Sequence, residues 1–238
     1  MNDADPGAQP EIASVRQEGL SAALGREIVG GRMQPGDVVT LDALQQRFEV
    51  SRTVARDAVK VLESLGLLYS KRRVGLVVKS PSEWNVYAPA VIAWRLESEK
   101  FRAAFVELTQ LRIAVEPEAA ALAAAHRTEA QAHDIEELAG RLRWLGEAGR
   151  LEQFMSVDIA FHRLLLTASG NMMFDALGDV VAQVLIGRTQ LGMMPARPRA
   201  EALDAHENVA RSVAAKDPEA ARKHMQPLVE EVRAALKP

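Results

Sequence analysis

Residues 41–65 read LDALQQRFEVSRTVARDAVKVLESL, and this stretch decides the fold of the first third of the chain. Apolar side chains at every third or fourth position predict a short helix over 41–48. Ser51 is a residue type that caps helix N-termini, and the apolar spacing after it predicts a second helix that ends near Leu65. The side chains that we expect this helix to bury are Val54, Ala58, Val61, Leu62 and Leu65. Two short helices with a tight connection between them indicate a helix-turn-helix.

The flanking sequence adds a helix before this pair and a hairpin after it. Helical spacing begins near Glu11 and ends at Gly30-Gly31. Two β-prone runs, 67–70 and 76–78, enclose a basic loop and predict a hairpin. The predicted divisions are a disordered tail (1–10), a winged helix-turn-helix domain (11–79), a linker (80–85) and a helical domain (86–238).

Charge is distributed unevenly along the chain, whose formal net charge is −3. Residues 11–80 hold eleven lysine and arginine residues against eight acidic ones, whereas residues 81–238 hold eighteen against twenty-two. A basic N-terminal third suits contact with DNA phosphates. The start of the second helix of a helix-turn-helix meets base edges in the major groove, and arginine matches guanine O6 and N7. The predicted DNA contacts are Arg47, Ser51, Arg52, Thr53, Arg56, Lys71, Arg72, Arg73 and Gly75. The alternative is that these charges form an ordinary solvated surface.

The remaining sequence is helical and predicts a mostly α fold. Aromatic residues make up only 5% of the chain, while alanine and leucine are abundant, which favours helices packed on helices. Helical periodicity covers 86–94, 99–125, 128–148, 151–168, 171–193, 197–215 and 218–236, which we expect to form an antiparallel bundle of six to seven helices. The absence of cysteine excludes disulfides and cysteine-based sites. No apolar run or leader pattern indicates a membrane or secretory segment, so we expect a cytoplasmic protein.

Five charged or titratable side chains fall on helix faces that should point into this bundle. Asp158 and His162 share a face at i and i+4, and His206, Arg112 and Arg188 occupy inward positions on three other helices. Buried charges must find partners. Imidazole and carboxylate suit a divalent cation such as Zn²⁺, and arginine suits the carboxylate of a small ligand. Internal pairing of the same side chains is the alternative.

The DNA-binding region resembles that of the GntR family. Three motifs carry the resemblance: Gly31-Arg32-Met33-Gln34-Pro35-Gly36, then Val50-Ser51-Arg52-Thr53 followed by Arg56, then Leu65-Gly66-Leu67-Leu68. The family often has proline at the position of Val54 and glutamate at that of Asp57. The resemblance covers about 20–79 and implies a DNA-binding transcription regulator.

The rest of the chain resembles the FCD effector domain of the FadR-like subfamily, and segments 82–85 and 91–96 resemble the galactonate-operon type, whose members respond to sugar acids. This resemblance implies metal ligands at Asp158, His162 and His206. Leu228 stands where the family often has a fourth ligand, a histidine. His224, one turn earlier, is the remaining candidate, although its place at the edge of the apolar stripe favours a surface position. Segment 167–171 also resembles the family, and its last residue, Asn171, is either a helix cap or an effector contact.

These observations together predict a homodimeric, ligand-responsive regulator rather than an enzyme. Helix-turn-helix proteins read two half-sites with two recognition helices, which implies a dimer. The expected partners are double-stranded operator DNA and a small carboxylate such as a sugar acid, and the expected action is repression relieved by the effector. A regulator that senses a metal ion alone is one alternative. A metal-dependent hydrolase is a more remote one, because no general base is visible near the predicted ligands and an enzyme does not need a winged helix.

Overall fold

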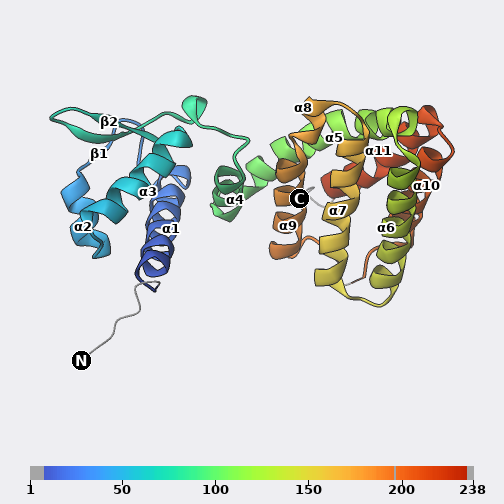
Figure 1. The fold of residues 1–238 in the computed structure, drawn as a ribbon, viewed down its shortest axis with the longest axis horizontal. Helices are drawn as coiled ribbons and strands as arrows, with labels where there is room; N and C mark the ends of the chain where they lie inside the picture. The colour runs from blue at the N-terminus through green and yellow to red at the C-terminus, as the bar shows by residue number, and fades with distance from the viewer. Residues whose placement is uncertain (1–7, 196, 235–238) are drawn as a thin grey trace. The chain divides into compact units, whose positions relative to one another are not determined.

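The chain divides into two units between Phe101 and Arg102. The structure is a computed structural model that describes residues 8–195 and 197–234, with the side chains of the first and last helices described from residue 19 and up to residue 230. Helices dominate both units, and a small sheet belongs to the first (Figure 1). Within the described residues, no helix is long and apolar enough to cross a membrane.

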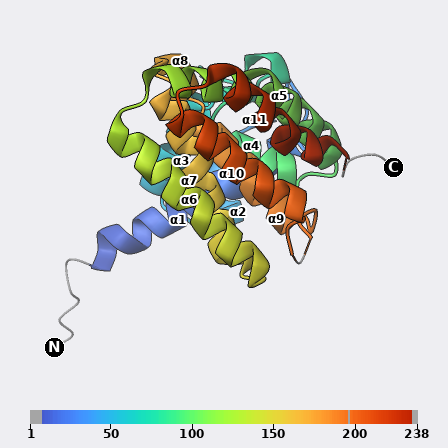
Figure 2. The ribbon, with the colours of Figure 1, turned by 90° about the vertical axis from the view of Figure 1, so that its right-hand side faces the viewer.

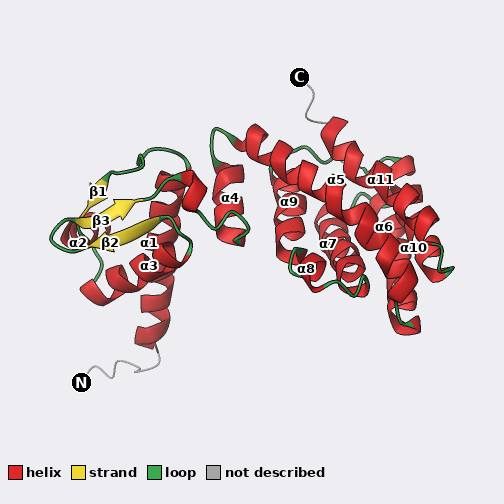
Figure 3. Cartoon of the chain, turned by 90° about the horizontal axis from the view of Figure 1, so that it is seen from above, coloured by secondary structure: helices red, strands yellow, loops and turns green. Residues whose placement is uncertain are grey.

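The first unit is a winged helix-turn-helix extended by one helix. Its elements are α1 Ala8–Val29, β1 Val38–Val39, α2 Leu41–Phe48, α3 Arg52–Ser64, β2 Leu68–Lys71, β3 Gly75–Val78, a 3-10 turn Pro81–Glu83 and α4 Pro89–Glu97. The three strands pair antiparallel in the order β1-β3-β2 (Figure 3). Lys71 pairs with Gly75, so residues 72–74 form the tip of the wing.

Side-chain caps set the ends of the helix-turn-helix pair. Thr40 Oγ1 accepts a hydrogen bond from Ala43 N at 3.1 Å and starts α2. Glu49 has a left-handed backbone with φ of 52°, which ends α2 and turns the chain. Ser51 Oγ accepts from Val54 N at 3.3 Å and starts α3, which confirms the predicted cap.

The core of this unit gathers apolar side chains from all its helices and from the wing. Its fully buried members include Leu24, Ile28, Leu44, Leu62, Leu67 and Leu68. In α3 the predicted stripe needs a correction, because Ala55 and Val59 are buried whereas Val61 and Leu65 are only half-buried. The buried face of α3 is therefore rotated slightly from the prediction, and Arg56 stays outside it.

The domain boundary differs from the predicted one at residue 86. Helix α4 packs on α1, and Val91 and Trp94 belong to the core of the first unit. The contact is close, since a Cβ on Gly25 of α1 would lie 2.3 Å from Cζ3 of the Trp94 ring. Helix α4 therefore completes the first unit, and the bundle begins with the following helix.

The second unit is a helical bundle whose elements are α5 Phe101–His126, α6 Glu129–Glu147, α7 Leu151–Ala168, α8 Met172–Asp175, α9 Gly178–Gln190, α10 Ala200–Ala214 and α11 Pro218–Ala234. Figure 2 shows α10 lying between α6 and α11, and α6 also packs on α7. The core between them is built mostly from alanine, leucine and valine, together with Ile135, Met225 and two phenylalanines, Phe154 and Phe161.

Three local features differ from the predictions. The predicted helix 171–193 is two helices, because Leu177 N bonds to Phe174 O, three residues back, and Thr167 Oγ1 bonds to the Asp175 carboxylate at 2.5 Å. Strand β1 was not predicted, since two residues are too few to show alternation. Helix α1 begins at Ala8, inside the predicted tail 1–10, and residues 1–7 lie outside the described residues.

Candidate DNA-binding surface and buried polar site

The first turns of α3 present polar and basic side chains to solvent. Arg52, Thr53 and Arg56 are all exposed. Arg52 Nη1 lies 3.6 Å from Asp42 Oδ1, but both side chains are more than two-thirds exposed, so this pair is weak. Arg56 makes no ion pair with any described residue. This helix end therefore offers two arginines and the positive end of the helix dipole to an anionic surface.

Arg47, which was predicted as a DNA contact, forms an ion pair with another residue of the protein. Its guanidinium donates two hydrogen bonds to the carboxylate of Glu27 on α1, one of them at 2.8 Å from Nη1 to Oε2. It also lies 5.0 Å from the centre of the Phe48 ring. The Arg47 side chain is 53% exposed and that of Glu27 only 12%. The contacts of Arg47 thus favour a structural role, in which its ion pair with Glu27 holds α2 against α1.

The wing carries Lys71, Arg72 and Arg73 as exposed side chains. Arg73 has a positive φ of 63° at the tip. Gly75 has φ of 130°, and a Cβ there would lie 2.9 Å from Val39 O of the neighbouring strand, so this position requires glycine. The exposed ring of Tyr69 on β2 was not predicted as part of this surface.

The wing is fixed to the C-terminal half of α3 through one carboxylate. Glu63 Oε1 accepts hydrogen bonds from Ser70 N at 2.8 Å and from Ser70 Oγ at 2.7 Å. Ser70 of the wing is thereby held to α3, and the basic side chains of the wing tip and of the start of α3 belong to the same unit.

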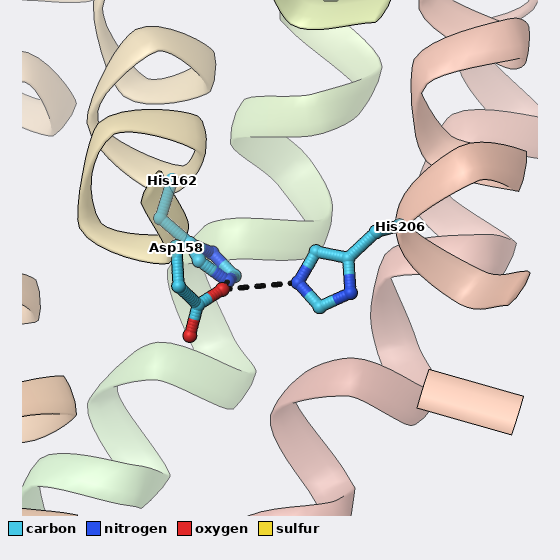
Figure 4. A group of neighbouring side chains, drawn as sticks. All are labelled: Asp158, His162 and His206. Atoms are coloured by element: carbon cyan, nitrogen blue, oxygen red, sulfur yellow. Dashed lines mark hydrogen bonds and ion pairs between the residues drawn. The ribbon is translucent and has the colours of Figure 1, made fainter. Parts of the chain in front are cut away.

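In the second unit, Asp158, His162 and His206 converge as predicted. One ligand atom from each lies within 4.8 Å of the others, and all three side chains are buried. Asp158 and His162 project from α7, and His206 reaches across from α10 (Figure 4). His206 Nε2 lies 3.0 Å from Asp158 Oδ1, and His162 Nε2 lies 3.4 Å from the same oxygen. The convergence follows from the i, i+4 pair on α7 and the inward position on α10.

Both imidazoles place Nε2 next to Asp158 and Nδ1 next to another oxygen, although the two rings are nearly perpendicular, with an interplanar angle of 80°. His206 Nδ1 lies 2.7 Å from Ala202 O, and His162 Nδ1 lies 2.5 Å from Glu116 Oε2. In each ring Nε2 is the nitrogen nearest Asp158, and loss of the proton from Nε2 would leave a lone pair there for a cation. Two imidazole nitrogens and one carboxylate oxygen then face one point, and this donor set fits a divalent cation of the Zn²⁺ type.

Glu116 is the functional residue that the sequence reasoning missed. It is only 2% exposed on α5 and accepts two hydrogen bonds from Arg112, one turn earlier, including one of 3.2 Å from Nη2. The i, i+4 spacing of Arg112 and Glu116 was the available signal. The remaining nitrogen, Arg112 Nη1, is buried without a hydrogen-bond partner among the described residues.

The buried charges shift one another's pKa values. Burial raises the pKa of Glu116, but the charges of Arg112 and His162 outweigh it and lower the pKa to about 2. Burial lowers the pKa of His162, but Glu116 and Asp158 together raise it to about 9. Burial also opposes ionisation of Asp158, yet hydrogen bonds from His162 and His206 hold its pKa below the usual range. Both carboxylates are therefore ionised at neutral pH.

A small cavity of about 20 Å³ lies against this cluster, enough space for about one water molecule or ion. Arg112 and Arg188, the two predicted arginines, line it together with Asp158, His162 and His206. The rest of the wall is apolar and consists of Phe154, Leu185, Met194, Pro195, Pro198, Ala202 and Leu228.

Two other predicted residues are placed elsewhere. Asn171 caps α8 by accepting from Met173 N at 2.9 Å, and it lies outside the lining of this cavity. His224 is half-buried, and its Nδ1 lies 3.0 Å from Ser212 Oγ rather than at the cluster. Leu228 lines the cavity beside the three clustered side chains, so the position expected for a fourth ligand carries an apolar residue.

Comparison with known proteins agrees with both units. The profile of the gntR family of bacterial regulatory proteins matches residues 16–78, and that of the FCD domain matches residues 107–231. The regulator LutR of Bacillus subtilis is 31% identical over 67% of this chain and 70% of its own length. The galactonate operon transcriptional repressor of Escherichia coli is 27% identical over 71% of this chain and 75% of its own length.

Solved structures agree in fold. Lar of Listeria monocytogenes superposes with a TM-score of 0.61 at 16% identity, over 92% of this chain and 95% of that one. McbR/YncC of E. coli superposes with a TM-score of 0.52 at 18% identity, over 93% of this chain and 96% of that one. The DNA-binding unit, the helical bundle and these matches have one explanation: the chain belongs to the GntR family of bacterial transcription regulators and carries an FCD domain.

Proposed function

We propose that this chain is a homodimeric repressor that leaves its operator when a small carboxylate binds beside a divalent cation in the bundle. The observation that carries the ligand response is the convergence of Asp158, His162 and His206 within 4.8 Å in a buried cavity. The exposed basic side chains of α3 and of the wing supply the DNA contact. Arg52 and Arg56 of α3 contact base edges, and the wing contacts phosphates or the minor groove through Lys71, Arg72 and Arg73.

The cation would be held by Asp158 Oδ1 and the Nε2 atoms of His162 and His206. Three protein ligands leave at least one coordination position for water or an effector oxygen. Glu116 would orient the His162 ring from outside the ligand set, the role that carboxylates commonly have next to metal-bound histidines.

Charge balance supports an anionic effector. Around the cavity, Arg112 and Arg188 offset the charges of Glu116 and Asp158, so a divalent cation leaves two positive charges uncompensated in a buried place. A carboxylate would offset one of them. Arg112 lines the cavity, and its Nη1 is buried without a hydrogen-bond partner among the described residues, so it could serve as a donor to the carboxylate.

The response to the effector would come from different affinities for two arrangements of the dimer. A helix-turn-helix regulator reads two half-sites, and their spacing depends on how the two bundles hold the DNA-binding units. An effector that binds one arrangement more tightly shifts the population towards it.

Two assays test this function. Operator binding to a fragment from beside the protein's own gene is measured for the wild type, Arg56→Ala and the control Lys60→Ala on the same helix. We expect Arg56→Ala to reduce the preference over a scrambled fragment by about 1–3 kcal/mol, whereas Lys60→Ala keeps it. Equal preference in all three proteins would refute base reading by Arg56.

The second assay measures DNA release by Zn²⁺ alone, by carboxylates alone and by both together. Release that needs both supports the proposal. Release by Zn²⁺ alone favours the second candidate function, a regulator that senses a metal ion. The small volume of the cavity also favours this candidate, since about 20 Å³ holds an ion but no organic acid without rearrangement.

A further inference from the structure

A second hollow adjoins the polar cavity on its α10–α11 side. It is a groove of about 310 Å³, lined by Arg199, Glu201, Ala202, Ala205, Pro227 and Leu228. Ala202 and Leu228 also line the polar cavity, so these two side chains alone are shared by both walls. The floor of the groove is apolar, while the two charged residues, Arg199 and Glu201, are exposed.

Most of the polar side chains that line the cavity already face the proposed cation site or pair with another residue. Asp158, His162 and His206 face the point where a cation fits, and Arg112 is committed to Glu116 through two of its nitrogens. Arg188 is the remaining polar side chain of the lining, and the others are aliphatic, aromatic or proline. Arg188 aside, this part of the described wall offers no side-chain partner to a hydroxyl group, so a ligand with several hydroxyl groups would bury most of them unpaired, and each such loss lowers affinity by roughly tenfold or more.

We infer that the effector is a carboxylic acid with an apolar tail, and that the tail leaves the cavity between Ala202 and Leu228 and lies in the groove beside Ala205 and Pro227. This inference rests on the proposed effector site. It gives a role to Leu228, an apolar side chain at the boundary between a charged cavity and an apolar groove. It also supplies the space that a cavity of about 20 Å³ lacks for any chain longer than a few atoms.

The test makes two comparisons: two six-carbon acids that differ only in hydroxyl groups, and a series of unbranched acids that differ only in chain length. Binding of hexanoate and gluconate to the full chain with one equivalent of Zn²⁺ is measured by calorimetry, together with acetate, butanoate and octanoate. We expect hexanoate to bind at least about tenfold more tightly than gluconate, and affinity to rise by up to about fourfold per methylene from butanoate to octanoate.

Filling the groove should remove the effect of chain length. Ala205→Met places a longer side chain on the groove floor, and Ala215→Met makes the same change at an exposed position at the end of α10. We expect Ala205→Met to bind acetate like the wild type but to gain nothing from butanoate to octanoate. The control Ala215→Met should show the same gain in affinity from butanoate to octanoate as the wild type.

The possible failures are distinct. If gluconate binds as tightly as hexanoate, or affinity does not change with chain length, the apolar tail is refuted while the effector site stands. If no carboxylate binds, acetate included, both the effector site and this inference are wrong.

Discussion

Oε2 of Glu116 lies 2.5 Å from Nδ1 of His162, and this contact turns the other ring nitrogen of His162 towards Asp158. The same carboxylate takes two hydrogen bonds from Arg112. One buried glutamate thus connects the arginine proposed to bind the effector with a histidine proposed to bind the cation. Its removal should therefore disturb the proposed cation binding, although Glu116 is not among the three clustered side chains proposed to hold the cation.

Glu116→Gln should weaken Zn²⁺ binding by about 10–100-fold, because the amide cannot hold the His162 ring with a negative charge. The measurement is a competition titration against a chromophoric chelator. Glu118→Gln is the matched control, since Glu118 lies on the same helix but pairs with Arg222 at a partly exposed site. Circular dichroism should show both variants folded, and a folded Glu116→Gln protein with wild-type Zn²⁺ affinity would contradict the prediction.

Leu228→His should tighten Zn²⁺ binding by at least about tenfold, because Leu228 lines the cavity beside Asp158, His162 and His206 and an imidazole there adds a fourth ligand. The same competition titration measures the change. Leu228→Phe is the control, since it adds a ring of similar size without a ligand atom. The prediction fails if the histidine variant binds Zn²⁺ no more tightly than the phenylalanine variant.

Gly25→Ala should destabilise the first unit by about 1–3 kcal/mol, because the new Cβ would lie 2.3 Å from the Trp94 ring and α1 and α4 would have to separate. Gly19→Ala on the same helix is the control, since nothing lies within 4 Å of a Cβ there and alanine favours a helix by about 0.5–1 kcal/mol. Thermal unfolding followed by tryptophan fluorescence measures both. A Gly25→Ala protein as stable as the Gly19→Ala protein would show that α4 does not pack as described.

Much of the fold could be predicted from local sequence. Ser51 and the spacing after it located α3, and the run from Leu67 to Val78 indicated the wing. Helical spacing could not assign α4 to a unit, because it shows that Val91 and Trp94 are buried but not which core buries them. The break between α8 and α9 was not predicted; Asp175, at the end of α8, accepts a hydrogen bond from Thr167 of another helix, a contact that the sequence of 171–193 alone does not show.

The buried site was predictable where ligands share a helix or follow an apolar stripe. Asp158 and His162 met the first condition and His206 the second. Glu116 was missed because a single acidic residue in a helix is usually solvated, and its burial depends on Arg112 and His162 as partners. The partner of Arg47 lies twenty residues away on α1, so its sequence neighbourhood suggested DNA contact instead.

Arg47→Ala tests whether Arg47 pairs with Glu27 or contacts DNA, because an ion pair with Glu27 affects protein stability whereas a phosphate contact affects the salt dependence of operator binding. If Arg47 holds α2 to α1, its removal costs at least the roughly 0.2–1 kcal/mol of stability typical of exposed pairs, because the Glu27 side chain is only 12% exposed, and costs nothing further in a Glu27→Gln background. The slope of operator affinity against salt concentration should stay at the wild-type value. Arg72→Ala, on the exposed wing, is the control and should reduce that slope by about one. A reduced slope in Arg47→Ala as well would show that its guanidinium leaves Glu27 for a phosphate when DNA binds.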